Sequence, residues 1–403
     1  MHIIESGNVA AAWGVKLSKA QVVAAYPITP QTPLTEKLSE LIESGEMKAQ
    51  YIPVESEHSA LAVCIAASTT GARAFTATSA NGLLYMNEQI HWAAGARLPL
   101  VMCVVNRGVG APWTIWNDHQ DSMSQRDTGW IQIYACDHQQ IIDTVIKAFR
   151  LAETVSIPVM VCYDGYLLSH TYMPFDVPDE TQVDRFLPSY RPERFLDPNM
   201  PANFNTVTLP ESRPDLQGEP APGYMEFRTL LHKDMRNALN TAADIEQAFS
   251  EAFGRGGDPF IEAWRCEDAD CIAVALGSLA YQLRDVVDVL REEGIRAGVA
   301  AIRIYRPFPD EAVFRLLAGA KKVIVFEKAL SYGYEGPLCA DIKSALYAHL
   351  SSLPERPDVQ GVILGLGGRE IKTDDLVDVF RQSCKDDRAS GKTKWLGLTQ
   401  KQL

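Results

Sequence analysis

The sequence predicts an α/β fold built on a doubly wound, mostly parallel sheet. Short apolar runs bounded by turn residues alternate with stretches of helical periodicity as far as about residue 170. Several of these runs end in polar clusters, which is typical of strands at the ligand-binding edge of an α/β sheet. With 403 residues, 46% of them hydrophobic, the chain is long enough for two or three domains of roughly 150 residues each.

The elements of the first unit follow from the spacing of apolar residues. Helices are expected where Ala or Leu recurs every three or four residues, and buried strands where apolar residues run together without interruption. Residues 1–4 are too few to assign. The predicted order is helix 8–17, strand 20–25, helix 35–44, strand 49–52, helix 59–67, strand 74–78, helix 83–94, strand 98–105, a long polar loop to 129, strand 131–136, helix 140–155 and strand 158–163.

The second half of the chain begins with a change in composition. Residues 173–223 are rich in proline and poor in periodic apolar positions, which predicts a tether that wraps across a neighbour. A second α/β unit is expected after it, and the tail after Gly365 reads as short and polar. The predicted order is helix 225–253, strand 271–276, helix 280–293, strand 298–303, helix 311–317 and strand 322–326. We therefore expect a first domain over 1–172, a tether and connecting helix over 173–267, and a second α/β domain over 268–403.

Composition excludes several classes of function. The formal net charge of -13 argues against nucleic acid as a partner, because phosphate backbones require basic surface. No apolar run approaches the roughly 20 residues that span a bilayer, and the N-terminus lacks a signal-peptide pattern, so we expect a cytoplasmic protein without a membrane contact. The eight cysteines are scattered without Cys-x-x-Cys spacing, which predicts no metal site in this chain and no iron-sulfur cluster of its own.

Three strand ends carry the candidate site residues. After the strand 20–25 the chain reads YPITPQTP (26–33), where prolines fix φ and hold Tyr26, Pro27 and Thr29 in a rigid turn. Glu57 follows the strand 49–52, and Arg107 follows the strand 98–105. Because parallel strands end at one edge of a sheet, these side chains are expected to converge on one crevice.

Each candidate also has a simpler structural interpretation. Ser56 can cap the helix that starts near Glu57, with the acid favourable in its first turn. A buried guanidinium needs a negative partner, so Arg107 suits either a substrate carboxylate or an ion pair with Asp118 or Asp121. Thr29 alone is more often a turn-forming hydroxyl.

Nine segments together resemble the α subunits of pyruvate:ferredoxin oxidoreductase and its 2-oxoacid:ferredoxin relatives. Their order and spacing, over nearly the whole chain, make the resemblance more specific than any one segment. The segments are YPITPQTP (26–33), ESEH (55–58), TSANGL (78–83), RLPLVMCVVNR (97–107), APWTIWNDHQDSMSQRDTGWIQ (111–132), YDGYLLSH (163–170), GYMEFR (223–228), ALGS (275–278) and RIYRPFP (303–309).

The resemblance implies a fold, a reaction and roles for the candidate residues. The fold is a transketolase-like domain that binds the pyrimidine half of thiamine diphosphate, followed by a smaller domain like the transketolase C-terminal one. The reaction is oxidative decarboxylation of pyruvate with coenzyme A, giving acetyl-CoA, CO₂ and reduced ferredoxin. Glu57 matches the catalytic glutamate that meets N1′ of the pyrimidine, while Arg107 and Thr29 match the residues that hold the 2-oxoacid. Tyr26, Pro27, Thr29, Glu57 and Arg107 would line the cofactor site.

The resemblance also implies partner subunits, because half of the cofactor site is missing. The family's enzymes hold Mg²⁺ and the diphosphate with a Gly-Asp-Gly segment and a later asparagine, but here Tyr163 precedes Asp164-Gly165. A β subunit would supply that half, a γ subunit the coenzyme A surface, and β and a ferredoxin-like δ subunit the iron-sulfur clusters. Another 2-oxoacid (branched-chain, aromatic or 2-oxoglutarate) remains an alternative substrate, and a non-catalytic scaffold subunit remains an alternative role.

Several further residues and segments have more than one interpretation. Asn117 to Asp121, with His119 among acids, resembles a set of metal ligands but fits a lid or a subunit contact better, as does the segment that starts at Asp164. Trp113 and Trp116 can line a substrate pocket or fill an interface. The glycines of 365–370 lack the spacing of a nucleotide-binding loop and predict a surface turn.

Overall fold

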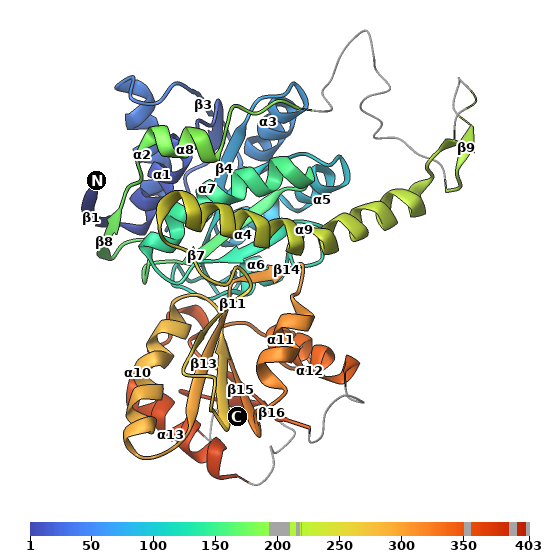
Figure 1. Cartoon of the computed structure of the whole chain (residues 1–403). Coiled ribbons are helices and arrows are strands. Elements are labelled where there is room, and N and C mark those ends of the chain that lie inside the picture. The colour runs from blue at the N-terminus through green and yellow to red at the C-terminus, as the bar shows by residue number, and fades with distance from the viewer. Residues whose placement is uncertain (193–209, 215–217, 219, 350–355, 387–392, 400–403) are drawn as a thin grey trace.

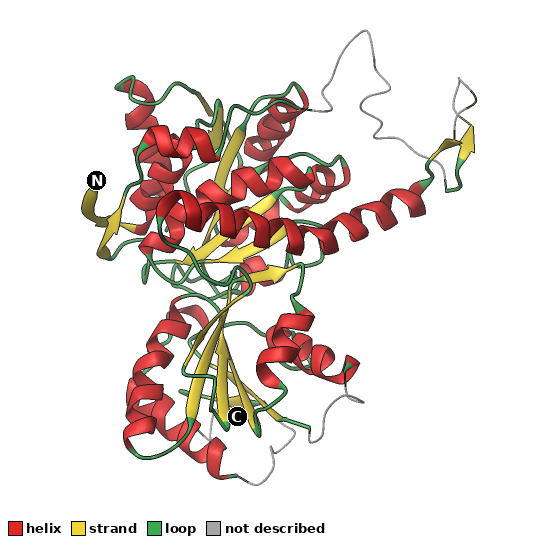
Figure 2. Ribbon diagram, viewed as in Figure 1, coloured by secondary structure: helices red, strands yellow, loops and turns green. Residues whose placement is uncertain are grey.

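The computed structural model describes residues 1–192, 210–214, 218, 220–349, 356–386 and 393–399. Two sheets, each covered by helices on both faces, are stacked one above the other (Figure 1 and Figure 2). Among the described helices, none is long and apolar enough to cross a membrane. The α/β class expected from the sequence, with mostly parallel sheets, is confirmed.

The first sheet has seven strands in the order β14-β6-β7-β5-β4-β2-β3. All neighbours in it are parallel except β14, which runs antiparallel to β6. The central strands are apolar and fully buried, because helices cover both of their faces. The strands are β2 (Val22–Ala25), β3 (Gln50–Pro53), β4 (Ala74–Thr78), β5 (Val101–Asn106), β6 (Ile131–Tyr134), β7 (Val159–Asp164) and β14 (Ile304–Arg306).

The helices of this domain form two layers with separate apolar cores. One core joins one face of the sheet to α1 (Gly7–Leu17), α2 (Thr32–Glu43), α7 (His138–Val155), α8 (Glu180–Phe186) and α9 (Tyr224–Phe253). The other joins the opposite face to α3 (Glu57–Thr69), α4 (Ala80–Tyr85) and α5 (Asn87–Gly95). A short helix, α6 (Gln120–Met123), lies within the loop after β5.

The second sheet has six strands in the order β11-β13-β12-β15-β16-β17, and only β11 is antiparallel to its neighbour. One face packs against α10 (Ser278–Glu292) and α13 (Thr373–Lys385), the other against α11 (Asp310–Leu317) and α12 (Pro337–Ala348). The strands are β11 (Ile261–Trp264), β12 (Cys271–Ala275), β13 (Ala297–Ile302), β15 (Lys322–Glu327), β16 (Asp358–Ile363) and β17 (Lys394–Trp395).

Several segments differ from the sequence predictions. The segment expected as an irregular tether contains β8 (Tyr172–Asp176), which pairs with β1 (His2–Ser6), and then α8; residues 193–209 lie outside the described residues. The tail expected to be polar contains α13, whose Leu376 and Phe380 are fully buried among charged neighbours. The helix expected over 83–94 is two helices, α4 and α5, which meet at Met86.

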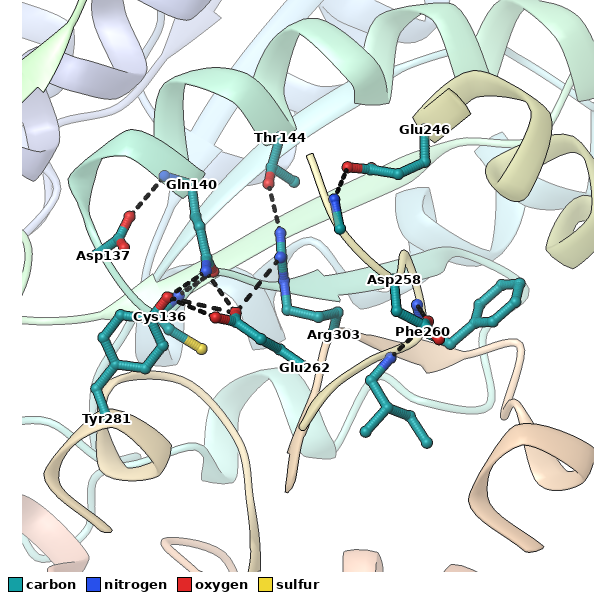
Figure 3. A network of polar contacts seen from close by, with 12 residues as sticks. Cys136, Asp137, Gln140, Thr144, Glu246, Asp258, Phe260, Glu262, Tyr281 and Arg303 are labelled. Carbon is teal, nitrogen blue, oxygen red and sulfur yellow. Dashed lines mark hydrogen bonds and ion pairs between the residues drawn. The ribbon is translucent and has the colours of Figure 1, made fainter. Parts of the chain in front are cut away.

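The two domains are joined by backbone pairing and by polar contacts. Although β14 falls within the range expected for the second domain, it extends the first sheet. Beside it, Gln140 on α7 donates to Glu262 on β11 (2.8 Å) and to the Tyr281 hydroxyl on α10 (2.6 Å) (Figure 3). Arg303 donates to Thr144 Oγ1 at 3.4 Å in the same network. These contacts fix the two sheets relative to each other.

The start of α9 projects away from the body of the molecule, toward the short hairpin of β9 (Arg213–Pro214) and β10 (Pro220–Ala221) (Figure 1). Tyr224, Met225 and Leu230 on this projecting part are exposed. The later turns of α9, by contrast, bury Ala238, Ala242 and Phe249 against the first domain.

Candidate functional site

The candidate residues lie at the carboxyl edge of the first sheet. Since β4 lies between β2 and β5, the segment that follows β4 (79–82) starts between the turn after β2 and the loop that begins at Arg107 after β5. Gly82 in this segment lies against Glu57, and Asn81 bonds to Gly110 in the loop after Arg107. The site is therefore built from three strand ends around one central segment.

Glu57 is the first residue of α3, and Ser56 caps that helix by accepting a hydrogen bond from Ser59 N at 3.2 Å. The capping interpretation of Ser56 is therefore correct, but it does not account for the Glu57 carboxyl. Glu57 as a whole is only 8% exposed, and no described residue forms a hydrogen bond or an ion pair with its carboxyl. A buried carboxyl without a partner is costly to a folded chain unless a ligand meets it.

Gly82 supports Glu57 from the central segment. A Cβ at position 82 would lie 2.6 Å from Glu57 Oε1 and 2.6 Å from Thr78 Oγ1, so only glycine fits there. Thr78 Oγ1 is itself buried without a hydrogen-bond partner among the described residues. Two unpartnered polar groups therefore lie against the same glycine.

Arg107 is 1% exposed, and its guanidinium is only partly satisfied. Nε donates to Thr114 O at 2.9 Å and Nη1 donates to Thr29 O at 2.7 Å, whereas Nη2 is buried and has no partner among the described residues. Burial lowers the pKa of this guanidinium, with a partial opposing effect from the charge of Asp121. The expected convergence of Thr29 and Arg107 is observed, although Thr29 contributes its carbonyl.

The alternative ion pair between Arg107 and Asp118 or Asp121 is not formed. Asp121 Oδ2 accepts the backbone N–H groups of Arg107 and Ala80, each at 3.0 Å. Asn106 donates to Asp121 Oδ1 at 2.8 Å. Burial raises the pKa of Asp121 to about 6, against the lowering effect of these hydrogen bonds. Asp121 thus braces the backbone on both sides of the site and forms no ion pair with the guanidinium.

Asn81 holds the loop after Arg107 by two reciprocal hydrogen bonds. Its Nδ2 donates to Gly110 O, and Gly110 N donates to its Oδ1, each at 3.1 Å. Within this loop the Trp113 ring lies over the Arg107 guanidinium, 4.7 Å from ring centroid to Cζ, and is 70% exposed. Trp113 therefore covers the charged group from the solvent side.

The remaining predicted residues and loops lie around the site or are buried beside it. Tyr26 and Pro27 are exposed beside Thr29. The segment that starts at Asp164 was expected to be a lid or a subunit contact. Asp164 itself is fully buried and bonded to His119, which is incompatible with a lid, while the subunit contact stays a prediction. The glycine turn near 367 packs against Trp116, so it is a contact and not only a surface turn. Among the described residues, no group of three or more His, Cys, Asp or Glu side chains could hold a metal ion.

The comparisons with known proteins match both domains. Residues 14–236 match the family model described as "Pyruvate flavodoxin/ferredoxin oxidoreductase, thiamine diP-bdg", and residues 269–376 match "Pyruvate:ferredoxin oxidoreductase core domain II". The chain is 42% identical to pyruvate synthase subunit PorA of Methanocaldococcus jannaschii, over 98% of this chain and 97% of that protein. It is 44% identical to ketoisovalerate oxidoreductase subunit VorA of Pyrococcus furiosus, over 98% of each.

Two solved structures share the fold at low sequence identity. The 2-oxoglutarate:ferredoxin oxidoreductase from Magnetococcus marinus superposes with a TM-score of 0.71 at 21% identity, over 95% of this chain; this chain spans 65% of that one. A split-gene transketolase superposes with a TM-score of 0.54 at 15% identity, over 95% of this chain and 99% of the other.

The stacked parallel sheets, with a partnerless carboxyl at the start of α3, define a class: transketolase-like α/β proteins of the kind that bind thiamine diphosphate. Within that class, the chain belongs to the pyruvate flavodoxin/ferredoxin oxidoreductase family, as an α-type subunit of a 2-oxoacid:ferredoxin oxidoreductase. The resemblance seen in the sequence is thereby confirmed.

Sequence reasoning missed the polar groups that brace the site. Asn81 carries a sequence signal, because it follows a strand within TSANGL, yet its partner Gly110 lies 29 residues away. Lys328 directly follows an apolar strand, as Arg107 does, and could have been singled out for the same reason. Asp164 also follows an apolar strand, but its contacts with the second domain gave no signal, and Asp121 lies in a polar loop with partners from several separate elements.

Proposed function

We propose that this chain supplies the pyrimidine-binding carboxylate and the substrate-binding arginine of a multi-subunit 2-oxoacid:ferredoxin oxidoreductase that acts on pyruvate. One observation carries the proposal: Glu57 is 8% exposed with no hydrogen bond or ion pair to its carboxyl among the described residues, and Arg107 Nη2 is buried without a partner among them. An acceptor and a donor left open at the same sheet edge suit a cofactor nitrogen and a substrate carboxylate respectively.

The residues present fit the pyrimidine half of thiamine diphosphate. When bound, this cofactor supplies a nucleophilic carbon at C2, whose proton leaves to the aminopyrimidine. In the proposal Glu57 holds a proton at N1′, which is general acid-base work in a site shielded from water. Gly82 leaves Glu57 room for that contact, since any side chain at position 82 would displace the carboxyl.

Arg107 would orient the 2-oxoacid. Nη2 offers N–H donors to a carboxylate, while Thr29 O and Thr114 O hold the other two nitrogens in place. A guanidinium fixed in this way loses little conformational freedom on binding, which favours a charge-assisted hydrogen bond. Trp113 would exclude water from the pair and limit the size of the 2-oxoacid side chain.

Partner chains would complete the enzyme. The proposal assigns the diphosphate and Mg²⁺ to a β subunit, the coenzyme A surface to a γ subunit, and iron-sulfur clusters to β and a ferredoxin-like δ subunit, with ferredoxin as the electron acceptor. The sequence supports this assignment, because the eight cysteines lack the close spacing of iron-sulfur ligands. The exposed start of α9 suits a contact with a neighbouring subunit, in agreement with the expected tether.

Pyruvate is the preferred substrate in the proposal because relatives named pyruvate synthase subunit match the chain over its whole length. The 2-oxoacid of a branched-chain amino acid is the second candidate, since ketoisovalerate oxidoreductase subunits match equally well. The two differ only in the side chain beyond the keto group. Trp113 is therefore the residue we expect to discriminate between them.

The test is Glu57→Gln in the complete complex, with Glu55→Gln as the matched control. Glu55 is two residues away and exposed, and its carboxylate accepts the Ser59 hydroxyl. Loss of a general acid-base group typically costs about 10² to 10⁴-fold, so C2-proton exchange of bound thiamine diphosphate should slow by that range in Glu57→Gln and stay normal in the control. A near-normal exchange rate in Glu57→Gln would show that another group meets N1′.

A further inference from the structure

The second domain clamps one loop of the first domain with the carboxyl ends of three of its own strands. The loop, residues 113–121, follows Arg107. Gly277 and Ser278 lie in the segment after β12, Lys328 and Leu330 in the segment after β15, and Gly367 and Gly368 in the segment after β16. Since these strands are parallel, their ends meet at one edge, and that edge faces the loop and Asp164.

A fully buried carboxylate is at the centre of the clamp. Asp164 Oδ1 lies 2.6 Å from His119 Nε2 in the loop, and Oδ2 accepts from Ser278 N at 2.9 Å and also from the Ser278 hydroxyl. Lys328 Nζ lies 3.4 Å from Oδ2 and is itself 2% exposed. Burial alone would raise the pKa of Asp164, but Lys328, His119 and Ser278 hold it well below its usual range. A buried charge of this kind depends on its cationic partner.

Four further hydrogen bonds tie the loop to the same strand ends. His119 N donates to Lys328 O at 2.9 Å, and Leu330 N donates to Gln120 Oε1 at 3.0 Å. After β16, Gly367 N donates to Asp118 Oδ2 at 3.0 Å and Gly368 N to Asn117 O at 2.8 Å. The described part of the second domain thus contacts every loop residue from 117 to 120.

The same loop holds Arg107 on two sides. Before the clamped residues, Thr114 O accepts Arg107 Nε at 2.9 Å, and Trp116 O accepts Gly108 N at 2.9 Å. After them, Asp121 Oδ2 accepts Arg107 N at 3.0 Å. Any shift of residues 117–120 therefore moves an acceptor of the guanidinium and an acceptor of its backbone.

We propose that Lys328, in the second domain, is a positioning residue for the substrate: through Asp164 and His119 it fixes the loop that aims Arg107 at the 2-oxoacid carboxylate. The inference rests on the proposed function of Arg107. It gives the second domain a part in substrate binding, although Lys328 touches Arg107 only through the loop.

The test replaces Lys328 by methionine in the complete complex, which keeps the length of the side chain and removes the charge. The matched control is Lys321→Met, which removes an exposed lysine that pairs with Asp270 at the other end of the same domain. Because the Arg107 contact acts in the ground state and the transition state alike, Lys328→Met should raise KM for pyruvate at least about tenfold, with a smaller change in kcat. KM for coenzyme A and thiamine diphosphate content should stay at wild-type values, and the control should be unchanged throughout.

A second, milder variant keeps the test decisive if Lys328→Met does not assemble. Gln120→Ala removes the tie to Leu330 N and leaves the charges around Asp164 intact. It should raise KM for pyruvate in the same direction by a smaller factor. An unchanged KM for pyruvate in the assembled variants, whether or not the melting temperature falls, would overturn the positioning role. Other results would contradict the proposed function itself: a wild-type complex that oxidises no 2-oxoacid, or a near-normal C2-proton exchange rate in Glu57→Gln.

Discussion

Replacing Arg107 by alanine should impair substrate binding far more than cofactor binding. The variant removes the donor at Nη2, which has no partner in the described part of the chain, together with the donors to Thr29 O and Thr114 O. A hydrogen bond to a charged group is worth about 1.5 to 3 kcal/mol, so kcat/KM for pyruvate should fall by about 10 to 150-fold if one such bond is lost. The fall should be larger if the carboxylate uses two donors.

The same structure predicts how lysine behaves at this position. An ammonium keeps the charge but cannot hold both carbonyls and the carboxylate in one plane. Arg107→Lys should therefore recover part of the activity lost in Arg107→Ala, with a raised KM. Because the guanidinium also supports two loop carbonyls, both variants should show a modest fall in melting temperature.

The assay is steady-state viologen reduction by the assembled complex, with thiamine diphosphate content and a melting curve measured on each variant. Arg126→Ala is the matched control, since Arg126 lies near the same loop and pairs with the exposed Asp127. A wild-type kcat/KM in Arg107→Ala would refute the substrate-binding role. A defect fully explained by lost cofactor or lost assembly would refute it equally.

Two more substitutions test separate parts of the site, and a third tests Glu327, a buried carboxyl at the end of β15 in the second domain. Gly82→Ala places a Cβ 2.6 Å from Glu57 Oε1, so it should weaken thiamine diphosphate binding in a calorimetric titration of the complex; unchanged affinity would exclude the contact at Glu57. Trp113→Ala removes an exposed ring, so it should leave the melting temperature unchanged and shift the ratio of kcat/KM between pyruvate and its branched-chain analogue by about tenfold; an unchanged ratio would remove Trp113 from specificity. Burial raises the pKa of Glu327 from 4.5 to about 8, so the stability contributed by its protonated form is complete below about pH 4.5 and is lost as pH rises through about 8. Since glutamine does not titrate, the melting temperature of Glu327→Gln should rise relative to that of the wild type between about pH 4.5 and pH 8, and a constant difference would contradict the shift.

The fold could be predicted as far as its strands are uninterrupted apolar runs. The strands β4, β5, β7, β12 and β15 are such runs, and helices cover both faces of each. The short strands β11 and β14 were not predicted, because they hold only four and three residues and have no continuous apolar pattern. The helix α13 was not predicted, because its charged residues outnumber the apolar residues that it buries.

The site could be predicted where a single strand end carries the chemistry. Glu57 and Arg107 each follow a strand, and parallel topology then brings them to one edge. The contacts of the bracing groups could not be predicted, because their partners come from separate elements and, for Asp164 and Lys328, from the other domain. Lys328 and Asp164 are 164 residues apart, and their contact depends on how the two sheets are stacked. No local sequence pattern predicts that arrangement.

The central claim is that this chain holds half of a catalytic site, and reconstitution tests it most directly. The isolated chain and the complex assembled with its partner subunits would be titrated with thiamine diphosphate and Mg²⁺, then assayed for viologen reduction with pyruvate and coenzyme A. We predict weak cofactor binding and no turnover by the isolated chain, and both activities in the complex. Robust turnover by the isolated chain, or an assembled complex that oxidises no 2-oxoacid, would contradict the account.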